Sequence, residues 1–349
     1  MDDYFPGESL HKPDLIRDPV FFLYNHARPP TRIRMFYIPQ NVYDLLEWEK
    51  ILAALEGRAA SDPGKTFARG ISPLTAVESR ARIDLVTEMR NALIEGESCD
   101  FSGMTDVSSK ALRASKGSVL SLEELFAVRN TVRTIFRIRN YFTIQKERMP
   151  KCHDLSATMV PCDEMNAVLT KAFLDSGDLN GSTYPNIGRI EKAIQSIRQD
   201  IERQLSKLIH APHMEDVLQE KIHTTRSDRY VLLVKANMKG RVKGTVVDVS
   251  ASSSTLYVEP EAIASLNDEI FMRRAELERE IDKICAELSE RVGADSDAIA
   301  HNLGISSYLD FVLAAAKFSR DTKGAPPEIT DDPVIELYSA RHPLLTLLI

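Results

Sequence analysis

Glycine is scarce in this sequence, and the common catalytic motifs are absent. There are 15 glycines among 349 residues, which favours long helices over a fold with many tight turns. No Gly-x-Ser-x-Gly, His-Glu-x-x-His or Gly-x-Gly-x-x-Gly motif occurs, so nothing indicates a serine hydrolase, a zinc peptidase or a dinucleotide-binding enzyme. We therefore predict that this chain is not an enzyme by itself and has no catalytic residue.

The cysteines form no metal or redox motif. They are widely scattered, at Cys99, Cys152, Cys162 and Cys285. His153 could share a metal with its cysteine neighbours, but too few ligands converge to prefer that over ordinary thiols, and no metal is predicted. Scattered cysteines without a leader peptide fit the reducing cytoplasm. The apolar run Phe21–Tyr24 is far too short to span a bilayer, so no membrane partner is expected.

A nucleotide-binding P-loop is also missing. The only Gly-Lys-Thr is Gly64-Lys65-Thr66, and Ala59 stands where a phosphate-cradling loop needs its first glycine. The preceding segment, Leu45 to Leu55, has a helical pattern rather than that of a strand. We interpret Gly64 as a helix terminator, and we predict no bound cofactor in this chain.

Two segments carry large apolar residues at heptad spacing. In the first they are Ile187, Ile190, Ile194, Ile197, Ile201, Leu205 and Leu208. In the second they are Leu266, Ile270, Leu277, Ile281, Ile284, Leu288 and Val292. Each set forms one seam of a long helix. Two seams on either side of an insert predict an antiparallel arm with a tip.

The insert between the two seams has the pattern of β-strands. Strands are predicted at Arg229–Val234, Gly244–Val249 and Thr255–Val258, where β-branched and aromatic residues are frequent. Turn-forming residues separate them, notably the run Ser250–Ser254. The tip of the arm is therefore expected to be a small β structure.

The insert is positively charged although the whole chain is acidic. Between Lys221 and Lys243 there are seven Lys or Arg and one carboxylate, a local charge of +6, whereas the chain has a net charge of −7. This contrast favours a polyanionic partner, while a merely solvated basic surface is the alternative. No aromatic ladder accompanies the cations, so backbone contact is favoured over base stacking. The candidate phosphate-binding residues are Arg229, Lys235, Lys239, Arg241 and Lys243.

Two helix starts and one core helix are explicit in the sequence. Thr75–Glu78 and Ser121–Glu124 have the pattern of capping boxes. Behind the second box, apolar residues recur at helical spacing at Leu125, Val128, Val132, Ile135, Ile138 and Phe142. This stripe predicts a helix buried in a core. The arginines beside the stripe are predicted to be a solvated flank: Arg129, Arg133, Arg137 and Arg139.

The segment Lys243–Ser252, followed by Thr255–Pro260, resembles the clamp of the second bacterial MutS paralogue family. The resemblance continues in four shorter segments: Leu45–Leu52, Val119–Leu125, Tyr308–Ala314 and Glu336–Leu345. It covers roughly residues 41 to 345. The clamp of this family usually has a glycine where this chain has Ser253, which makes a turn with positive φ less comfortable there.

The resemblance implies a mainly α fold: a helical core plus a long antiparallel coiled-coil lever with a small β-rich clamp inserted at its tip. The expected parts are an unassigned N-terminal extension (1–40), the helical core (41–185), the ascending lever helix (186–221), the clamp (222–264), the descending lever helix with its return to the core (265–322), and a linker with the first strand of a truncated ATPase domain (323–349).

By resemblance, the function is that of the lever and clamp of a MutS-like ATPase that grips DNA or ribosomal RNA. Such proteins act as homodimers in suppression of recombination, DNA repair or rescue of stalled ribosomes. Their missing ATPase domain would use ATP and magnesium, and larger members add a nuclease domain. The Phe-x-Glu wedge of mismatch-repair MutS is absent, so mismatch reading is not expected. The alternative is a non-enzymatic coiled-coil protein-interaction module.

Overall fold

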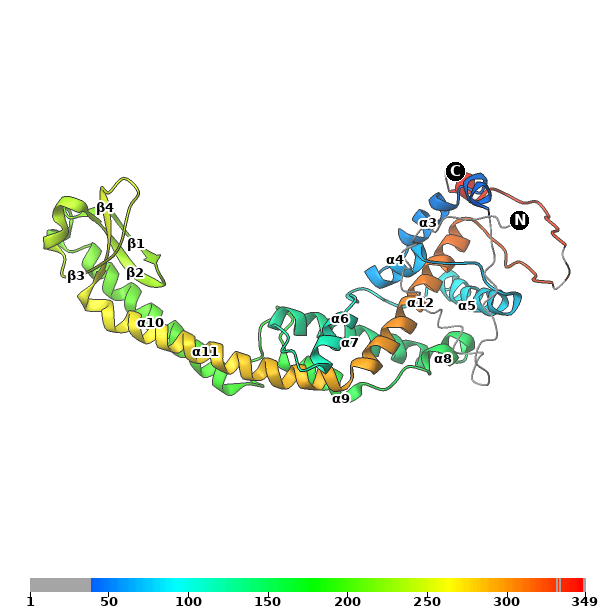
Figure 1. Ribbon diagram of the computed structural model, residues 1–349, viewed down its shortest axis with the longest axis horizontal. Coiled ribbons are helices and arrows are strands. Elements are labelled where there is room, and N and C mark those ends of the chain that lie inside the picture. The colour runs from blue at the N-terminus through cyan, green and yellow to red at the C-terminus, as the bar shows by residue number, and fades with distance from the viewer. Residues whose placement is uncertain (1–38, 331, 333, 348–349) are drawn as a thin grey trace, which may run out of the picture. The chain divides into compact units, whose positions relative to one another are not determined.

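The computed structural model describes residues 39–330, 332 and 334–347. The predicted extension, 1–40, thus lies almost entirely outside the described residues. The chain divides into two compact units, one made of residues 1–170 and 289–349 and the other of residues 171–288. Helices with one small antiparallel sheet confirm the predicted mainly α fold (Figure 1).

The first unit is entirely helical over the residues described. Its helices are α2 (Gln40–Leu45), α3 (Trp48–Glu56), α4 (Asp62–Arg69), α5 (Ala76–Ile94), α6 (Ser108–Ser115), α7 (Leu122–Ile144), α8 (Pro150–Ser156), α12 (Ser296–Asp321) and α13 (Pro343–Thr346). Helices α9 (Asp163–Ala172) and α11 (Glu261–Ala294) cross the boundaries between the units. Both predicted capping boxes are confirmed, at the starts of α5 and α7.

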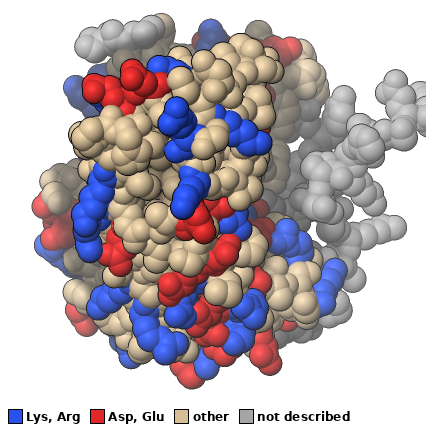
Figure 2. Space-filling view, turned by 90° about the vertical axis from the view of Figure 1, so that its left-hand side faces the viewer, with Lys and Arg blue, Asp and Glu red and all other residues tan. Residues whose placement is uncertain are grey.

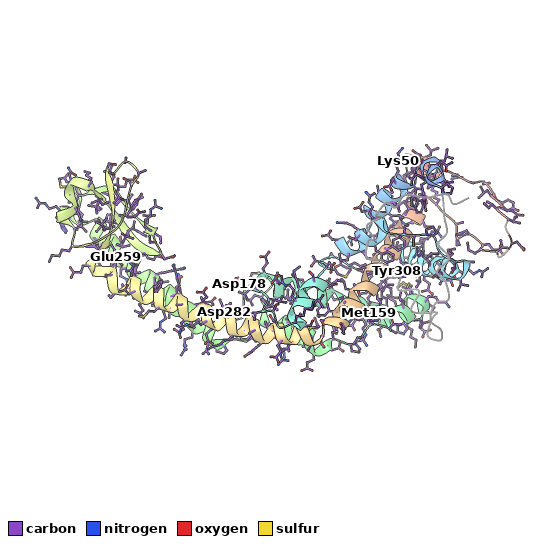
Figure 3. The ribbon with its side chains drawn as sticks, viewed as in Figure 1. Lys50, Met159, Asp178, Glu259, Asp282 and Tyr308 are labelled. Carbon is purple, nitrogen blue, oxygen red and sulfur yellow. The ribbon has the colours of Figure 1, made fainter. Side chains whose placement is uncertain are left out.

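Helix α12 forms the centre of the first unit, with α3 to α8 packed around it. Every residue from Ile305 to Ala314 is buried, as is typical of a helix covered on all sides. Tyr308, labelled in Figure 3, packs its ring against Phe67 at 5.2 Å between centroids. This central position explains why α12 is apolar around its whole circumference rather than along one stripe.

A buried carboxylate fastens α4 to α12. Asp310 accepts hydrogen bonds from the backbone N–H groups of Ala60 (3.0 Å) and Ser61 (2.8 Å) and from the Ser61 hydroxyl (2.6 Å). The interpretation of Gly64 as a helix terminator is wrong, because Gly64 lies inside α4. A Cβ at this position would overlap the Asp310 side chain, so close approach of the two helices requires the glycine.

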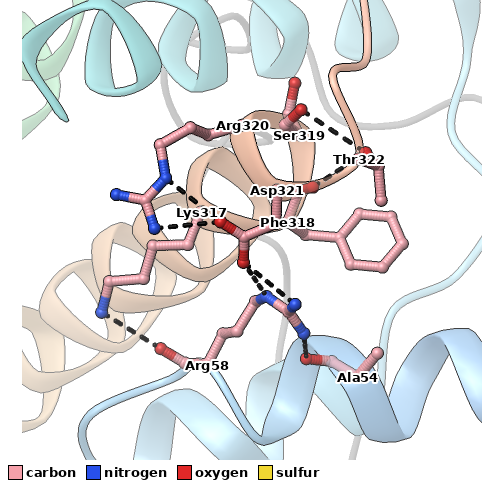
Figure 4. A network of polar contacts seen from close by, with 8 residues as sticks. All are labelled: Ala54, Arg58, Lys317, Phe318, Ser319, Arg320, Asp321 and Thr322. Atoms are coloured by element: carbon pink, nitrogen blue, oxygen red, sulfur yellow. Dashed lines mark hydrogen bonds and ion pairs between the residues drawn. The ribbon is translucent and has the colours of Figure 1, made fainter. Parts of the chain in front are cut away.

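The end of α12 is held to α3 by one arginine (Figure 4). Arg58 donates from Nε to Asp321 (3.0 Å) and from Nη1 to the carbonyl of Ala54 (2.8 Å), and its guanidinium lies 5.4 Å from the centre of the Phe318 ring. Lys317 in turn donates to the carbonyl of Arg58 (3.3 Å). These contacts hold the C-terminal end of α12 against the end of α3.

The predicted core stripe of α7 is confirmed, but one of its arginines is not solvated. All six apolar stripe residues are at most 5% exposed. Arg129 is only 3% exposed, its guanidinium lies 5.4 Å from the centre of the Phe126 ring, and it donates to Asn130 (2.9 Å). The prediction of a solvated flank is therefore wrong for Arg129, since stacking and hydrogen bonding compensate its burial.

The second unit contains a pair of long antiparallel helices, α10 (Pro185–Ile209) and α11 (Figure 1). Asn186 meets Glu280 (3.5 Å) and Arg189 meets Glu276 (3.9 Å), so residue numbers rise on one helix as they fall on the other. The seam residues of α10 from Ile187 to Leu205 are all buried. The predicted coiled-coil arm is thus present.

Helix α10 ends sooner than predicted. The ascending helix was expected to extend to residue 221, but α10 ends at Ile209. Pro212, which begins the 3-10 turn η1 (Pro212–Met214), cannot supply an N–H to a continuing helix. The residues after this turn enter the sheet.

The sheet has four strands rather than the three predicted. They are β1 (Leu218–Arg226), β2 (Arg229–Lys235), β3 (Gly244–Val249) and β4 (Thr255–Pro260), in the order β1-β2-β4-β3, all antiparallel. Ser227 and Asp228 join β1 to β2 with φ of 47° and 60°, as a two-residue hairpin turn requires. The short 3-10 helix η2 (Ala236–Arg241) precedes β3.

The segment that follows α12 forms no strand among its described residues. The first strand expected within 323–349 is not formed by the described residues, because no other described strand lies beside Val334–Leu337 to complete a ladder. In the described part of the chain, every helix is too short or too polar to serve as a membrane span.

Candidate nucleic-acid interface

The clamp, expected at 222–264, is formed by residues 218–260, and it is built on a core that it shares with the helix pair. Leu232, Val234 and Val258 from the sheet are at most 1% exposed and pack with Leu205 of α10 and Ile263 of α11. Alternation along β2 and β4 puts these residues on one face. The opposite face is partly covered as well, since Val231 is 0% and Glu259 6% exposed, whereas the turn residues Asn237 and Lys239 are exposed.

Gly244 sets how closely β3 approaches β4. It pairs with Pro260, and a Cβ at Gly244 would overlap the carbonyl oxygen of Glu259. Only glycine permits this approach. Lys243, the residue just before it, is thereby held beside the start of α11, where its carbonyl accepts a hydrogen bond from the Glu261 N–H (3.0 Å).

Arg229 is occupied by carboxylates within the clamp and α11. Its guanidinium donates to Glu259 (2.7 Å) and to Asp268 (2.7 Å). Glu259, labelled in Figure 3, has only 7% of its side chain exposed and also accepts from Asn267 (2.8 Å). These contacts raise the pKa of Arg229. The geometry joins the sheet to α11 and leaves Arg229 little capacity for an external phosphate.

Three other cations of the insert also have partners. Lys221 pairs with Glu215 (2.9 Å), and Lys235 donates to the carbonyl of Asp216 (2.9 Å). Arg226 lies 4.6 Å from the centre of the Tyr257 ring and donates to its hydroxyl (3.2 Å). Much of the local charge of the insert is therefore balanced or engaged within the unit.

The remaining candidate cations are Lys239, Arg241 and Lys243, which we call the cation cluster. All three are exposed. None of them makes a side-chain hydrogen bond or ion pair with a residue that the structure describes. Figure 2 faces the clamp end of Figure 1 and shows Lys and Arg set among uncharged side chains in some places and beside Asp and Glu in others. Among the candidate cations, the positive charge that remains available to bind an anion is thus confined to the cation cluster.

The loop between β3 and β4 has the strain expected from its sequence. Ser253 has φ of 58°, in the left-handed region that favours glycine. Hydrogen bonds hold the loop: Ser253 N–H donates to the Ser250 carbonyl (2.8 Å), and the Thr255 N–H donates to the Ser250 hydroxyl (3.0 Å). The expectation of an uncomfortable turn at Ser253 is confirmed.

Neither a metal site nor a nucleotide loop is assembled by the residues that the structure describes. No three His, Cys, Asp or Glu side chains among them gather as metal ligands do. Gly64, Lys65 and Thr66 lie in α4, which follows a helix rather than a strand, so they do not fit the triphosphate of ATP.

A helical core, a heptad-paired helix arm and a β clamp inserted between the two arm helices are the parts expected of a MutS-like protein. No protein-family model matches the chain. Three proteins named Endonuclease MutS2 are similar to it. The one from Pelotomaculum thermopropionicum is 30% identical over 301 residues, which are 86% of this chain and 38% of that protein. The one from Agathobacter rectalis is 29% identical over 309 residues, 88% of this chain and 39% of that protein.

The third, from Clostridium perfringens, is 30% identical over 308 residues, 87% of this chain and 39% of that protein. The chain therefore spans about two fifths of the length of the relatives it matches, and it is similar to that part of them. The resemblance noted in the clamp motif is thus confirmed along most of the sequence.

Proposed function

We propose that the clamp of this chain grips the phosphate backbone of a nucleic acid through the cation cluster. The observation that carries the proposal is that Lys239, Arg241 and Lys243 are exposed, lie within five residues of one another, and have no partner among the described residues. Relatives named as endonucleases support a nucleic acid as the polyanion. Lys235 belongs to the same surface, and Arg229 acts by holding the sheet on α11.

The size of the effect follows from counterion release. Each phosphate that is neutralised on duplex DNA contributes a slope of about −0.9 to the dependence of log affinity on log salt. Three cations then give a slope of about −2.7 for each clamp. Affinity would fall roughly 40-fold between 50 and 200 mM salt.

The test measures binding of the full chain to duplex DNA and to ribosomes across a salt series. Each of K239Q, R241Q and K243Q is expected to flatten the slope by about one unit on the proposed target. K221Q is the matched control, because Lys221 is exposed but paired with Glu215, and its slope should stay near that of the parent. Binding that is insensitive to salt and survives the triple change would favour a coiled-coil protein-interaction module instead.

For a protein with the full length of the relatives, we propose wider roles that rest on the resemblance alone. These are an ATPase that uses ATP and magnesium, a homodimer in the cytoplasm, and action on DNA in suppression of recombination and repair or on ribosomal RNA in ribosome rescue. Comparing the affinities for DNA and for ribosomes at the same salt concentration decides between the two targets. Size measurement of the longer protein, with and without ATP, tests the dimer.

A further inference from the structure

A pocket of about 510 Å³ opens beside the cation cluster in the clamp unit. Its apolar lining includes Met214 and Leu232, which are at most 2% exposed and belong to the clamp core. Val242 and Pro260 are further apolar lining residues. The volume is within the range of small-molecule sites, roughly 300–1,000 Å³. The opening thus leads from the charged surface to an apolar floor.

Charged side chains also line the pocket, and two of them belong to the cation cluster. Arg241 and Lys243 line the pocket together with His213 and Glu261. Glu261 begins α11, is exposed, and its carboxylate has no recorded partner among the described residues. The lining of the pocket therefore offers both donors for a phosphate and an acceptor.

We propose that this pocket receives one unpaired base of the nucleic acid whose backbone the cation cluster holds. The inference rests on the proposed function, because Arg241 and Lys243 would bind the phosphate next to the base that enters. A nucleotide combines the two chemistries present, an apolar ring face and an anionic phosphate. A base that is already unpaired enters without the cost of leaving a duplex stack.

The carboxylate adds a preference among bases. Glu261 can accept a hydrogen bond from the exocyclic amino group of adenine, cytosine or guanine, as carboxylates do with the amino group of cytosine. Thymine and uracil carry no amino group. The clamp is thus expected to select nucleic acids with an unpaired, amino-bearing nucleotide over fully paired ones.

The test compares a fully paired DNA duplex with the same duplex carrying one unpaired dA or dT, using fluorescence anisotropy and the full chain. The dA bulge should bind about 10-fold more tightly than the paired duplex, which is about 1.4 kcal/mol. The dT bulge should bind less tightly than the dA bulge. An RNA duplex with the same bulges shows which backbone is preferred.

Two variants make the test specific. A262W places a large side chain in the pocket from an exposed position of the first turn of α11, and it should reduce the preference for the bulge to less than twofold while leaving affinity for the paired duplex unchanged. E261A removes the acceptor altogether and should bring the dA and dT bulges closer together. A circular dichroism melt checks that both variants are folded, and A262L replaces A262W if the latter is not.

Equal affinity of the parent for paired and bulged duplexes overturns the inference. It is also overturned if the preference for the bulge survives A262W, or if A262W lowers the affinity for both duplexes equally. These results are distinct from failure of the proposed function. If the proposed function fails, the parent binds the paired duplex without dependence on salt, or does not bind it.

Discussion

Replacing Arg229 with methionine should loosen the clamp rather than weaken its contact with phosphate. The guanidinium makes 2.7 Å bonds to Glu259 and Asp268, and the Glu259 side chain is only 7% exposed. Removing one partner of a fully buried pair costs about 3–5 kcal/mol, because the other charge stays buried. The Arg229 side chain is 36% exposed, and Asn267 still donates to Glu259. We therefore expect a loss of about 2–3 kcal/mol.

Hydrogen exchange of the β2 and β4 amides measures this loss where it occurs. A destabilisation of about 2–3 kcal/mol corresponds to a 30- to 150-fold fall in protection if these amides exchange by opening of the clamp. The matched control is K239M, which removes an exposed cation without a recorded partner and should change protection by less than about twofold. The double variant R229M/E259L should recover part of the protection, since it removes both members of the pair.

The opposite pattern would refute this reasoning. If R229M left the exchange of β2 and β4 as K239M does, but reduced the salt slope for duplex DNA by about one unit, Arg229 would be a phosphate contact. The ion pairs seen in the clamp would then open when nucleic acid binds.

Three further outcomes are expected. S253G should stabilise the clamp by about 0.5–1 kcal/mol, because it relieves the positive φ, and a lower urea midpoint of the clamp would contradict this. D310A should destabilise the first unit by about 3–5 kcal/mol, because the buried N–H and hydroxyl of Ser61 and the partly buried N–H of Ala60 lose a charged acceptor. Urea unfolding followed by Trp48 fluorescence measures this loss, and a value below about 1 kcal/mol would disprove it. Burial raises the pKa of Cys99 from the ordinary value of 9.0 to about 12. Between these pH values the unfolded chain releases this proton and the folded chain keeps it, so the free energy of unfolding should fall as pH rises. In C99A the free energy of unfolding should fall less steeply with pH than in the parent, by up to about 1.4 kcal/mol per pH unit. Equal slopes for C99A and the parent would argue against this.

Local patterns predicted the elements that depend on local chemistry. The heptad seams located α10 and α11, and the hydroxyl and glutamate pairs located the starts of α5 and α7. The early end of α10 was also available in the sequence, because Pro212 stands inside the range predicted to be helical. Strand β1 was missed because most of its residues are exposed, so its apolar residues do not alternate clearly.

Contacts between distant residues decided the features that patterns could not predict. Gly64 resembles a terminator until Asp310, which lies in α12, is seen to occupy the space beside it. Arg229 resembles the other cations of the insert until the fold brings Glu259 and Asp268 to it. The candidate interface was therefore predicted as a stretch of charge, whereas the subset of cations that remains free required the three-dimensional structure.

The two helices of the arm are attached to the sheet in different ways. Strand β4 ends at Pro260 and α11 begins at Glu261, with no residue between them, whereas residues 210–217 separate the end of α10 from the start of β1. A pull on the sheet would accordingly pass straight into α11, while the longer connection on the other side could absorb it. Strain imposed by a bound molecule would thus travel along one helix far more than along its neighbour.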